Sequence, residues 1–220
     1  MNIHHRRLIR LRYYDYSRLG SYFVTICTHN HECLFGNVID GEMALNNVGR
    51  IVYEEWLKSV CIRKEIDLDN WVIMPNHIHG IVVISTVGAN GGSPKYDHNP
   101  NAEANGVSPK TINNTIRAHG HAPLQGSQFS LKPHSIGSFI AGFKSITTKR
   151  VNQILNIRGQ SIWQRNYYER IIRDERELNK IRRYVINNPA KWTYDIENQN
   201  GLPIDDKQKF WSKFLNEFDG

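Results

Sequence analysis

Residues 71–84 read WVIMPNHIHGIVVI, in which two apolar runs flank Pro75 and Asn76. Because only these two residues separate the runs, we expect a pair of antiparallel strands joined by a tight turn. Successive side chains of a strand point to opposite faces, so His77 and His79 should share one face of the second strand. Two imidazoles side by side on a strand can form half of a divalent-metal site, although two ordinary strand histidines would give the same pattern.

The composition is that of one domain with appendages. The chain has 220 residues, of which 40% are hydrophobic and 10% aromatic. No stretch approaches the roughly 18 apolar residues of a membrane span, and the basic N-terminus lacks the apolar core of a secretory signal, so we expect no membrane association. Cys27, Cys33 and Cys61 show no spacing typical of a disulfide framework or a zinc knuckle, which predicts a cytoplasmic protein.

The pattern around the central stretch predicts an α+β fold. Strands are expected at residues 22–28, 66–74, 77–85 and 161–172, with amphipathic helices at 48–63 and from residue 135 onward. This βαββαβ order is the split pattern of a ferredoxin-like or RRM-like antiparallel sheet, which carries its helices on one face and leaves the other face available for a site. A short hairpin around Asp40 and Gly41 is expected before the first helix.

An added helix should follow the fourth strand. It is expected to begin at Asp174, with Glu177 three residues later as in a capping box, and to end before Pro189. Its apolar stripe would consist of Leu178, Ile181 and Val185. Tyr184 and Asn188 are four residues apart, so they should lie on nearly the same side of the helix, at the margin of the stripe.

Tyr184 and Asn188 have an ordinary interpretation as a core-edge tyrosine and a helix-capping asparagine. Their combination with the histidine pair and with basic surroundings makes them candidates for a functional site. The spacing of His77 and His79 is not specific by itself, because His-x-His also occurs at residues 29–31 and 119–121. The pair at 29–31 follows a strand and favours a surface role, while the pair at 119–121 has no strand to fix its geometry.

The domain organisation follows from changes in composition. Residues 1–195 are expected to form a single domain with a basic arm at 1–20 and a low-complexity insertion at 86–133, which is rich in Gly, Asn, Ser and Pro. Residues 196–220 are expected to be a C-terminal tail. One amphipathic patch in this tail, at residues 210–218, is expected to pack as a helix on the domain surface.

The net charge of +7 and the pI of about 9.3 favour phosphate backbones, anionic surfaces or acidic partners. Basic residues gather near the N-terminus and in a C-terminal block, and aromatic residues interleave with both, as in many nucleic-acid-binding surfaces. The candidate DNA contacts are Arg6, Arg7, Arg10, Arg12, Lys144, Lys149, Arg150, Arg165, Arg182 and Arg183.

These motifs together resemble those of the HUH single-tyrosine transposases, and more closely the REP-associated tyrosine transposase branch. The resemblance rests on PNHIHGIV, IWQRNYYERIIRD and YVINNP, and on the opening segments RLRYYDYSRLGSYFVTICT and ECLFGNVIDGEMALN. It covers most of residues 6–192 outside the insertion, so residues 1–195 would be the transposase domain. The insertion is longer than the usual connection in that branch.

The resemblance implies a mechanism and a set of site residues. His77 and His79 would bind a divalent metal, Mg²⁺ or Mn²⁺, with Asn188 as an additional polar ligand. Tyr184, on the added C-terminal helix, would be the nucleophile that cleaves and rejoins single-stranded DNA through a 5′-phosphotyrosine. The implied partner is single-stranded DNA with hairpin-forming repeats, and the protein would act as a monomer or a homodimer.

Other interpretations of the same residues remain. Tyr13, Tyr14 and Tyr16 suit base stacking, and the adjacent Tyr167 and Tyr168 should point to opposite faces of a strand. A non-catalytic nucleic-acid-binding protein on an RRM-like sheet has the same strand order, but it would need aromatic residues where His77 and His79 stand. A replication initiator or relaxase usually adds a helicase or primase region, and a metallohydrolase would need more carboxylates near the histidines.

Overall fold

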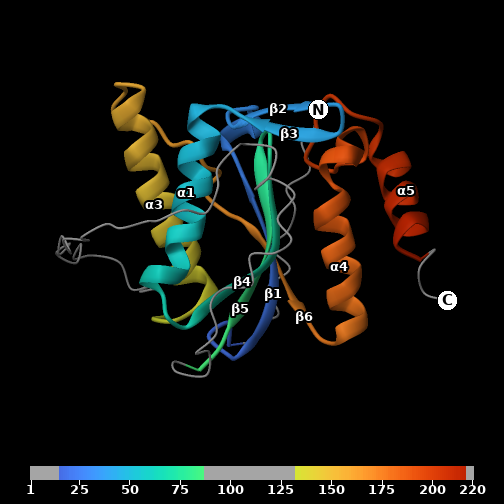
Figure 1. Ribbon diagram of the computed structural model, residues 1–220, viewed down its shortest axis with the longest axis horizontal. Coiled ribbons are helices and arrows are strands. Elements are labelled where there is room, and N and C mark those ends of the chain that lie inside the picture. The colour runs from blue at the N-terminus through green and yellow to red at the C-terminus, as the bar shows by residue number, and fades with distance from the viewer. Residues whose placement is uncertain (1–14, 87–131, 217–220) are drawn as a thin grey trace.

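Within the described residues, four strands form one antiparallel sheet in the order β4-β5-β1-β6 (Figure 1). The structure is a computed structural model, and it describes residues 15–86 and 132–216. The strands are β1 (Gly20–Cys27), β4 (Ile66–Met74), β5 (His77–Ile84) and β6 (Tyr168–Ile172). This order confirms the predicted α+β class and its split βαββαβ topology.

The hairpin of β4 and β5 lies where the central stretch predicts it, with Pro75 and Asn76 as its turn. His77 pairs with Met74 of β4 on one side and with Cys27 of β1 on the other, and His79 pairs with Thr25 of β1. Both histidines therefore belong to an inner strand with a neighbour on each side, which holds their backbones in place.

One face of the sheet is covered by α1 (Asn47–Ile62) and α3 (Ile136–Ile154) (Figure 1). The core on this face is aromatic, and the rings of Trp56 and Phe143 lie 5.0 Å apart, edge to face. A glycine follows the histidine pair because the Trp56 ring occupies the space beside it: a Cβ on Gly80 would lie 2.8 Å from the indole. Packing against Trp56 thus requires glycine at position 80, directly after the candidate site residue His79.

The opposite face is covered by α4 (Glu175–Asn187), which is the added helix (Figure 1). Its N-cap is Asp174, whose side chain accepts a hydrogen bond from the backbone N–H of Glu177. The Glu177 carboxylate returns a bond to the backbone N–H of Arg173 rather than to Asp174. The predicted stripe of Leu178, Ile181 and Val185 packs on the sheet residues Phe23, Val72, Met74 and Ile81.

α4 ends before Pro189 as predicted, and the chain stays ordered beyond this residue. A 3₁₀ segment, η2 (Pro189–Tyr194), follows α4 directly, and α5 (Ile204–Asn216) then packs beside α4 and η2 (Figure 1). Trp211 of α5 is 5% exposed, so the described part of the amphipathic patch packs on the domain as predicted, and residues 217 and 218 of the patch lie outside the described residues.

The expected hairpin at Asp40 and Gly41 is present as β2 (Gly36–Ile39) and β3 (Glu42–Leu45). Both turn residues have positive φ, 51° at Asp40 and 83° at Gly41, as a primed turn requires. A short 3₁₀ segment, η1 (His29–His31), precedes this hairpin. No helix in the described part of the chain is long and apolar enough to cross a membrane.

Two details of the sequence prediction are wrong. The fourth strand is shorter than 161–172, because residues 161–167 reach the sheet only through an isolated bridge between Trp163 and Thr28. In α3, the helical spacing of the apolar residues predicts that Ile146 is buried together with Ile136, Phe139, Ile140 and Phe143. Ile146 is instead 40% exposed, whereas the next residue, Thr147, is fully buried. The Thr147 hydroxyl binds the Trp163 indole N–H and its own helix carbonyl at Phe143, so a polar residue is satisfied in the core.

Candidate metal centre and nucleophile

His77 and His79 lie on the sheet face that α4 covers, with ring centroids 4.2 Å apart. Both side chains are buried, at 0% and 2% exposure. The Nδ1 atom of His79 is 2.9 Å from the Thr25 hydroxyl on β1, and the Nδ1 atom of His77 is 2.8 Å from the Asn76 side-chain oxygen. Partners of this kind fix the orientation of metal-binding imidazoles.

Asn76 also fixes the tautomer of His77. Its amide nitrogen donates to the backbone carbonyls of His31, at 3.2 Å, and Glu197, at 2.8 Å. Because carbonyl oxygens only accept, the NH₂ end of the amide must face them and the oxygen must face His77. An amide oxygen also only accepts, so Nδ1 of His77 must carry the proton. Nε2 of His77 is then the nitrogen that faces the cluster, and in the neutral imidazole it carries the lone pair that binds a metal.

Asp195 is the residue that sequence analysis missed. Its Oδ2 atom lies 3.3 Å from Nε2 of His79 and 3.8 Å from Nε2 of His77. The carboxyl is fully buried, and its other oxygen accepts a 2.6 Å hydrogen bond from the backbone N–H of Glu197. Two imidazoles and one carboxylate thus converge as a possible metal site. The only sequence signal was an acidic residue shortly after the tyrosine helix.

The charge of Asp195 is maintained by its neighbours. Burial by itself would raise the pKa of this carboxyl, but the His77 and His79 imidazoles outweigh burial and hold the pKa well below its ordinary value. Asp195 is therefore an anion at neutral pH. A buried anion between two imidazoles offers the negative charge and the oxygen donor that a divalent cation prefers.

Tyr184 points from α4 into this cluster, as the spacing of the helix predicted. Its hydroxyl is 3.1 Å from Nε2 of His79, and it donates to Oδ2 of Asp195, also at 3.1 Å. Its ring packs edge to face against Phe23 of β1 and against Trp211 of α5, with centroids 6.0 Å and 4.5 Å away. The phenol oxygen is thus held beside the candidate metal ligands.

Asn188 is fully buried at the C-terminal end of α4. Its amide nitrogen donates a 2.7 Å hydrogen bond to Oδ2 of Asp195. Its Oδ1 atom is buried and has no hydrogen-bond partner among the residues that the structure describes. A buried acceptor without a partner is costly, so this oxygen fits the additional polar ligand that was predicted.

The other tyrosines in the described ranges have different surroundings. The Tyr167 hydroxyl donates to Glu169, and the Tyr168 ring lies edge-on to Phe23 at the start of β6. Tyr16 packs against Tyr22. Tyr13 and Tyr14, like the histidines of the 119–121 pair, lie outside the described residues.

The candidate DNA contacts fall into four groups. Arg150 forms ion pairs with Glu54 and Glu55, and Arg182 with Asp69 and Glu175. Lys144 donates to the carbonyls of Gln164 and Asn166, and burial lowers its pKa to about 8. Lys149 and Arg165 are exposed, and Arg183 is half-buried. Arg6, Arg7, Arg10 and Arg12 lie outside the described residues. The DNA contacts stay a prediction, and internal pairing already occupies the first two arginines.

The fold and the site define a ferredoxin-like domain with two histidines, an aspartate and a tyrosine converging under an added helix. An uncharacterised protein of Haemophilus influenzae is 36% identical to the chain over 197 residues, which cover 88% of this chain and 93% of that protein. The chain belongs to the same family as this protein. No protein-family model matches it.

Two solved structures are similar to the chain. One is the REP-associated tyrosine transposase bound to a REP hairpin, with a TM-score of 0.48 and 16% identity over 83% of this chain and 73% of that one. The other is a candidate transposase from Deinococcus radiodurans R1, with a TM-score of 0.38 and 12% identity over 81% of this chain and 95% of that one.

Proposed function

We propose that the protein is a metal-dependent transposase that cleaves and rejoins single-stranded DNA through a tyrosine nucleophile. The observation that carries the proposal is the position of the Tyr184 hydroxyl, 3.1 Å from both Nε2 of His79 and Oδ2 of Asp195. A phenol fixed at this distance from two candidate metal ligands is poised to act on a phosphate bound to the same cation.

The residues present fit Mg²⁺ or Mn²⁺. His77 and His79 would provide their Nε2 nitrogens, Asp195 its Oδ2 oxygen, and Asn188 the buried amide oxygen that has no other described partner. A mixed set of nitrogen and oxygen donors suits Mn²⁺ as well as Mg²⁺. When bound, the cation would supply Lewis acidity toward a phosphate oxygen.

The protein groups have separate parts in the reaction. The Tyr184 oxygen attacks the phosphorus, the bond from phosphorus to the 3′-oxygen breaks, and that oxygen leaves as a 3′-hydroxyl after gaining a proton. The 5′-phosphate stays on Tyr184 until a 3′-hydroxyl attacks in the reverse direction. Asp195 accepts the hydrogen bond of the phenol and so orients its oxygen, whose proton must leave during attack because tyrosine ordinarily titrates near pH ~10.

Hairpin-forming single-stranded DNA is the substrate class that we propose, on the basis of the sequence resemblance to the REP-associated branch and of the basic composition. A non-catalytic binder that stacks bases on an RRM-like sheet fits the described residues less well. α4 covers the sheet face that such a protein would need to expose, and His77 and His79 are buried beneath it.

The test is a covalent adduct assay with an oligonucleotide hairpin carrying single-stranded flanks and a 3′ label. The wild-type protein should retain the label on a denaturing gel in the presence of Mn²⁺ or Mg²⁺, and EDTA should prevent this. Tyr184→Phe should form no adduct, because it removes the attacking oxygen and little else. Tyr168→Phe is the matched control, since Tyr168 lies on the same sheet face and its ring packs against Phe23, and it should form the adduct normally.

An adduct that persists in Tyr184→Phe would disprove the assignment of the nucleophile. An adduct that forms equally well in EDTA would disprove the metal dependence. DNA binding by wild-type protein with no adduct under any of these conditions would favour the non-catalytic binder.

A further inference from the structure

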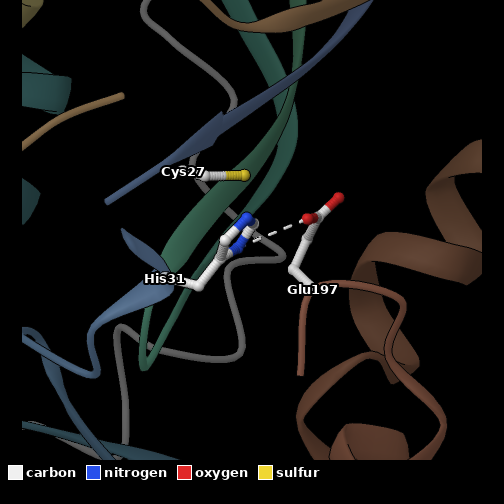
Figure 2. A group of neighbouring side chains, drawn as sticks. All are labelled: Cys27, His31 and Glu197. Carbon is white, nitrogen blue, oxygen red and sulfur yellow. Dashed lines mark ion pairs between the residues drawn. The ribbon is translucent and has the colours of Figure 1, made fainter. Parts of the chain in front are cut away.

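A second cluster of metal-binding side chains lies beside the candidate centre, at the end of β1 (Figure 2). Cys27 ends β1, His31 lies in η1, and Glu197 follows η2, so three separate segments contribute. The sulfur, a ring nitrogen and a carboxylate oxygen lie within 4.8 Å of one another. Figure 2 shows the His31 ring between the cysteine and the glutamate, with Nδ1 3.6 Å from the carboxylate.

The backbone around His31 is held in an uncommon conformation. Asn30 and His31 have φ values of 53° and 56°, in the left-handed region that residues other than glycine rarely adopt. Two such residues in succession cost free energy, and backbone strain of this kind is concentrated at functional sites. Here it directs the imidazole of His31 toward Cys27 and Glu197.

The ring nitrogen of His31 supplies a second and independent indication of a ligand. Its Nδ1 atom is buried and has no hydrogen-bond partner among the described residues, because the Glu197 carboxylate is 3.6 Å away. A buried nitrogen without a partner is destabilising, by roughly 1–3 kcal/mol in typical cases. A cation bound between this nitrogen and the carboxylate would give the nitrogen a partner.

We propose that Cys27, His31 and Glu197 form a second metal site, selective for Zn²⁺. Thiolate, imidazole and carboxylate are the ligand types of zinc sites, whereas a thiolate is a poor ligand for Mg²⁺ or Mn²⁺. Zinc bonds to nitrogen and oxygen of about 2.1 Å place two tetrahedral ligands roughly 3.4 Å apart. The separation of Nδ1 and the carboxylate is close to this value.

The second site is joined to the first through hydrogen bonds. Asn76 links the backbone carbonyls of His31 and Glu197 with one amide group, and its oxygen contacts His77. The backbone N–H of Glu197 donates to Asp195. Zinc would therefore fasten the segment after η2 to the end of β1, and this is a structural role that does not depend on DNA chemistry.

The proposal is tested by metal binding to the full chain without DNA. Cobalt(II) is the probe, because a cobalt–thiolate bond gives an intense near-ultraviolet absorption band that nitrogen and oxygen ligands do not give. We expect the band to reach a limit of one thiolate-bound cobalt per chain, with a total uptake of up to two equivalents as the His77, His79 and Asp195 site also fills. The band should disappear when Zn²⁺ displaces the cobalt. Cys27→Ser should abolish the band.

Matched controls are available for each ligand type. Cys33 and Cys61 are exposed cysteines outside the cluster, so Cys33→Ser and Cys61→Ser should keep the band. His31→Asn should weaken cobalt binding at least tenfold, because asparagine tolerates the left-handed backbone but lacks the imidazole. His29→Asn, in the same 3₁₀ segment, should bind cobalt like the wild type. Glu197→Gln should also weaken binding, and it remains informative if Cys27→Ser fails to fold.

A cobalt band that survives in Cys27→Ser but is lost in Cys33→Ser or Cys61→Ser would overturn the proposal. So would a wild-type protein that shows no cobalt–thiolate band in a titration under reducing conditions. In either case His31 and Glu197 would form only an ion pair. These results are independent of adduct formation by Tyr184, so they do not bear on the proposed transposase activity.

Discussion

At the scale of single residues, the candidate metal centre depends on which nitrogen of each imidazole carries its proton. Asn76 determines this for His77, because both amide protons of Asn76 are given to backbone carbonyls. Thr25 has the corresponding position for His79, with its hydroxyl 2.9 Å from Nδ1. These two residues are buried at 1% and 2% exposure, so water does not easily replace them.

The role of Thr25 can be tested by removing its hydroxyl. Thr25→Val keeps the shape of the side chain but leaves Nδ1 of His79 without its partner, and losses of this kind typically lower metal affinity about 10–100-fold. We expect that decrease for Mn²⁺, measured by calorimetry on the full chain. Thr25→Ser, which restores the hydroxyl, should recover most of the affinity. Equal Mn²⁺ affinity of the valine variant and the wild type would show that Thr25 does not position His79.

The sequence predicts four of the five residues of the candidate site, but it does not predict Asp195. The strand period put His77 and His79 on one face, and the helix period put Tyr184 and Asn188 on one side. The resemblance to the transposases predicted that the two pairs form one site. Asp195 was missed, because its position depends on the 3₁₀ turn after Pro189, which no period predicts. The metal and nucleophile roles of all five residues stay predictions.

At the scale of elements, the sequence predicts a boundary well where a turn or cap residue satisfies the neighbouring backbone groups. The Asp40-Gly41 turn and the Asp174 cap of α4 were predicted from residues that satisfy nearby backbone groups. The short β6 and the exposed Ile146 were not predictable, because both depend on the tertiary contacts of Trp163 with Thr28 and with Thr147. Local propensity does not contain that tertiary information.

Two helical glycines allow a matched test of packing against intrinsic helix propensity. A Cβ on Gly49 of α1 would lie 2.1 Å from the carbonyl oxygen of Phe35, whereas a Cβ on Gly142 of α3 would meet nothing within 4 Å. Gly142→Ala should therefore raise the free energy of unfolding by about 0.4–1 kcal/mol. Gly49→Ala should lower it by roughly 1–3 kcal/mol, because the backbone must shift.

Urea denaturation of the two variants beside the wild type measures both changes. Stabilisation by Gly49→Ala would mean that the connection before β2 moves away easily and that this packing does not constrain α1. A destabilised Gly142→Ala would mean that this face of α3 makes contacts beyond those of the described residues.

At the scale of the whole molecule, the sheet separates two different environments. α1 and α3 lie on one face of the sheet and α4 on the other (Figure 1). The first face holds most of the apolar core, and the second holds the buried polar cluster. The segment after residue 195 belongs to this second side. Glu197 and Asn198 are buried, and α5 packs beside α4. The boundary expected after residue 195 therefore falls within a closely packed region.

Trp211 tests whether α5 supports the candidate active site. Its ring lies 4.5 Å from the Tyr184 ring, and its indole N–H donates to the carbonyl of Tyr194 at 2.9 Å. Trp211→Ala should lower the free energy of unfolding by about 3–5 kcal/mol, as for other buried tryptophans, and should slow adduct formation because the phenol loses a wall of its pocket.

Trp211→Phe keeps the ring contact and loses one hydrogen bond, worth about 1 kcal/mol, so it should form the adduct nearly as fast as the wild type. Urea denaturation and the adduct assay measure these effects, and a Trp211→Ala protein with unchanged stability and adduct rate would show that α5 is an independent tail.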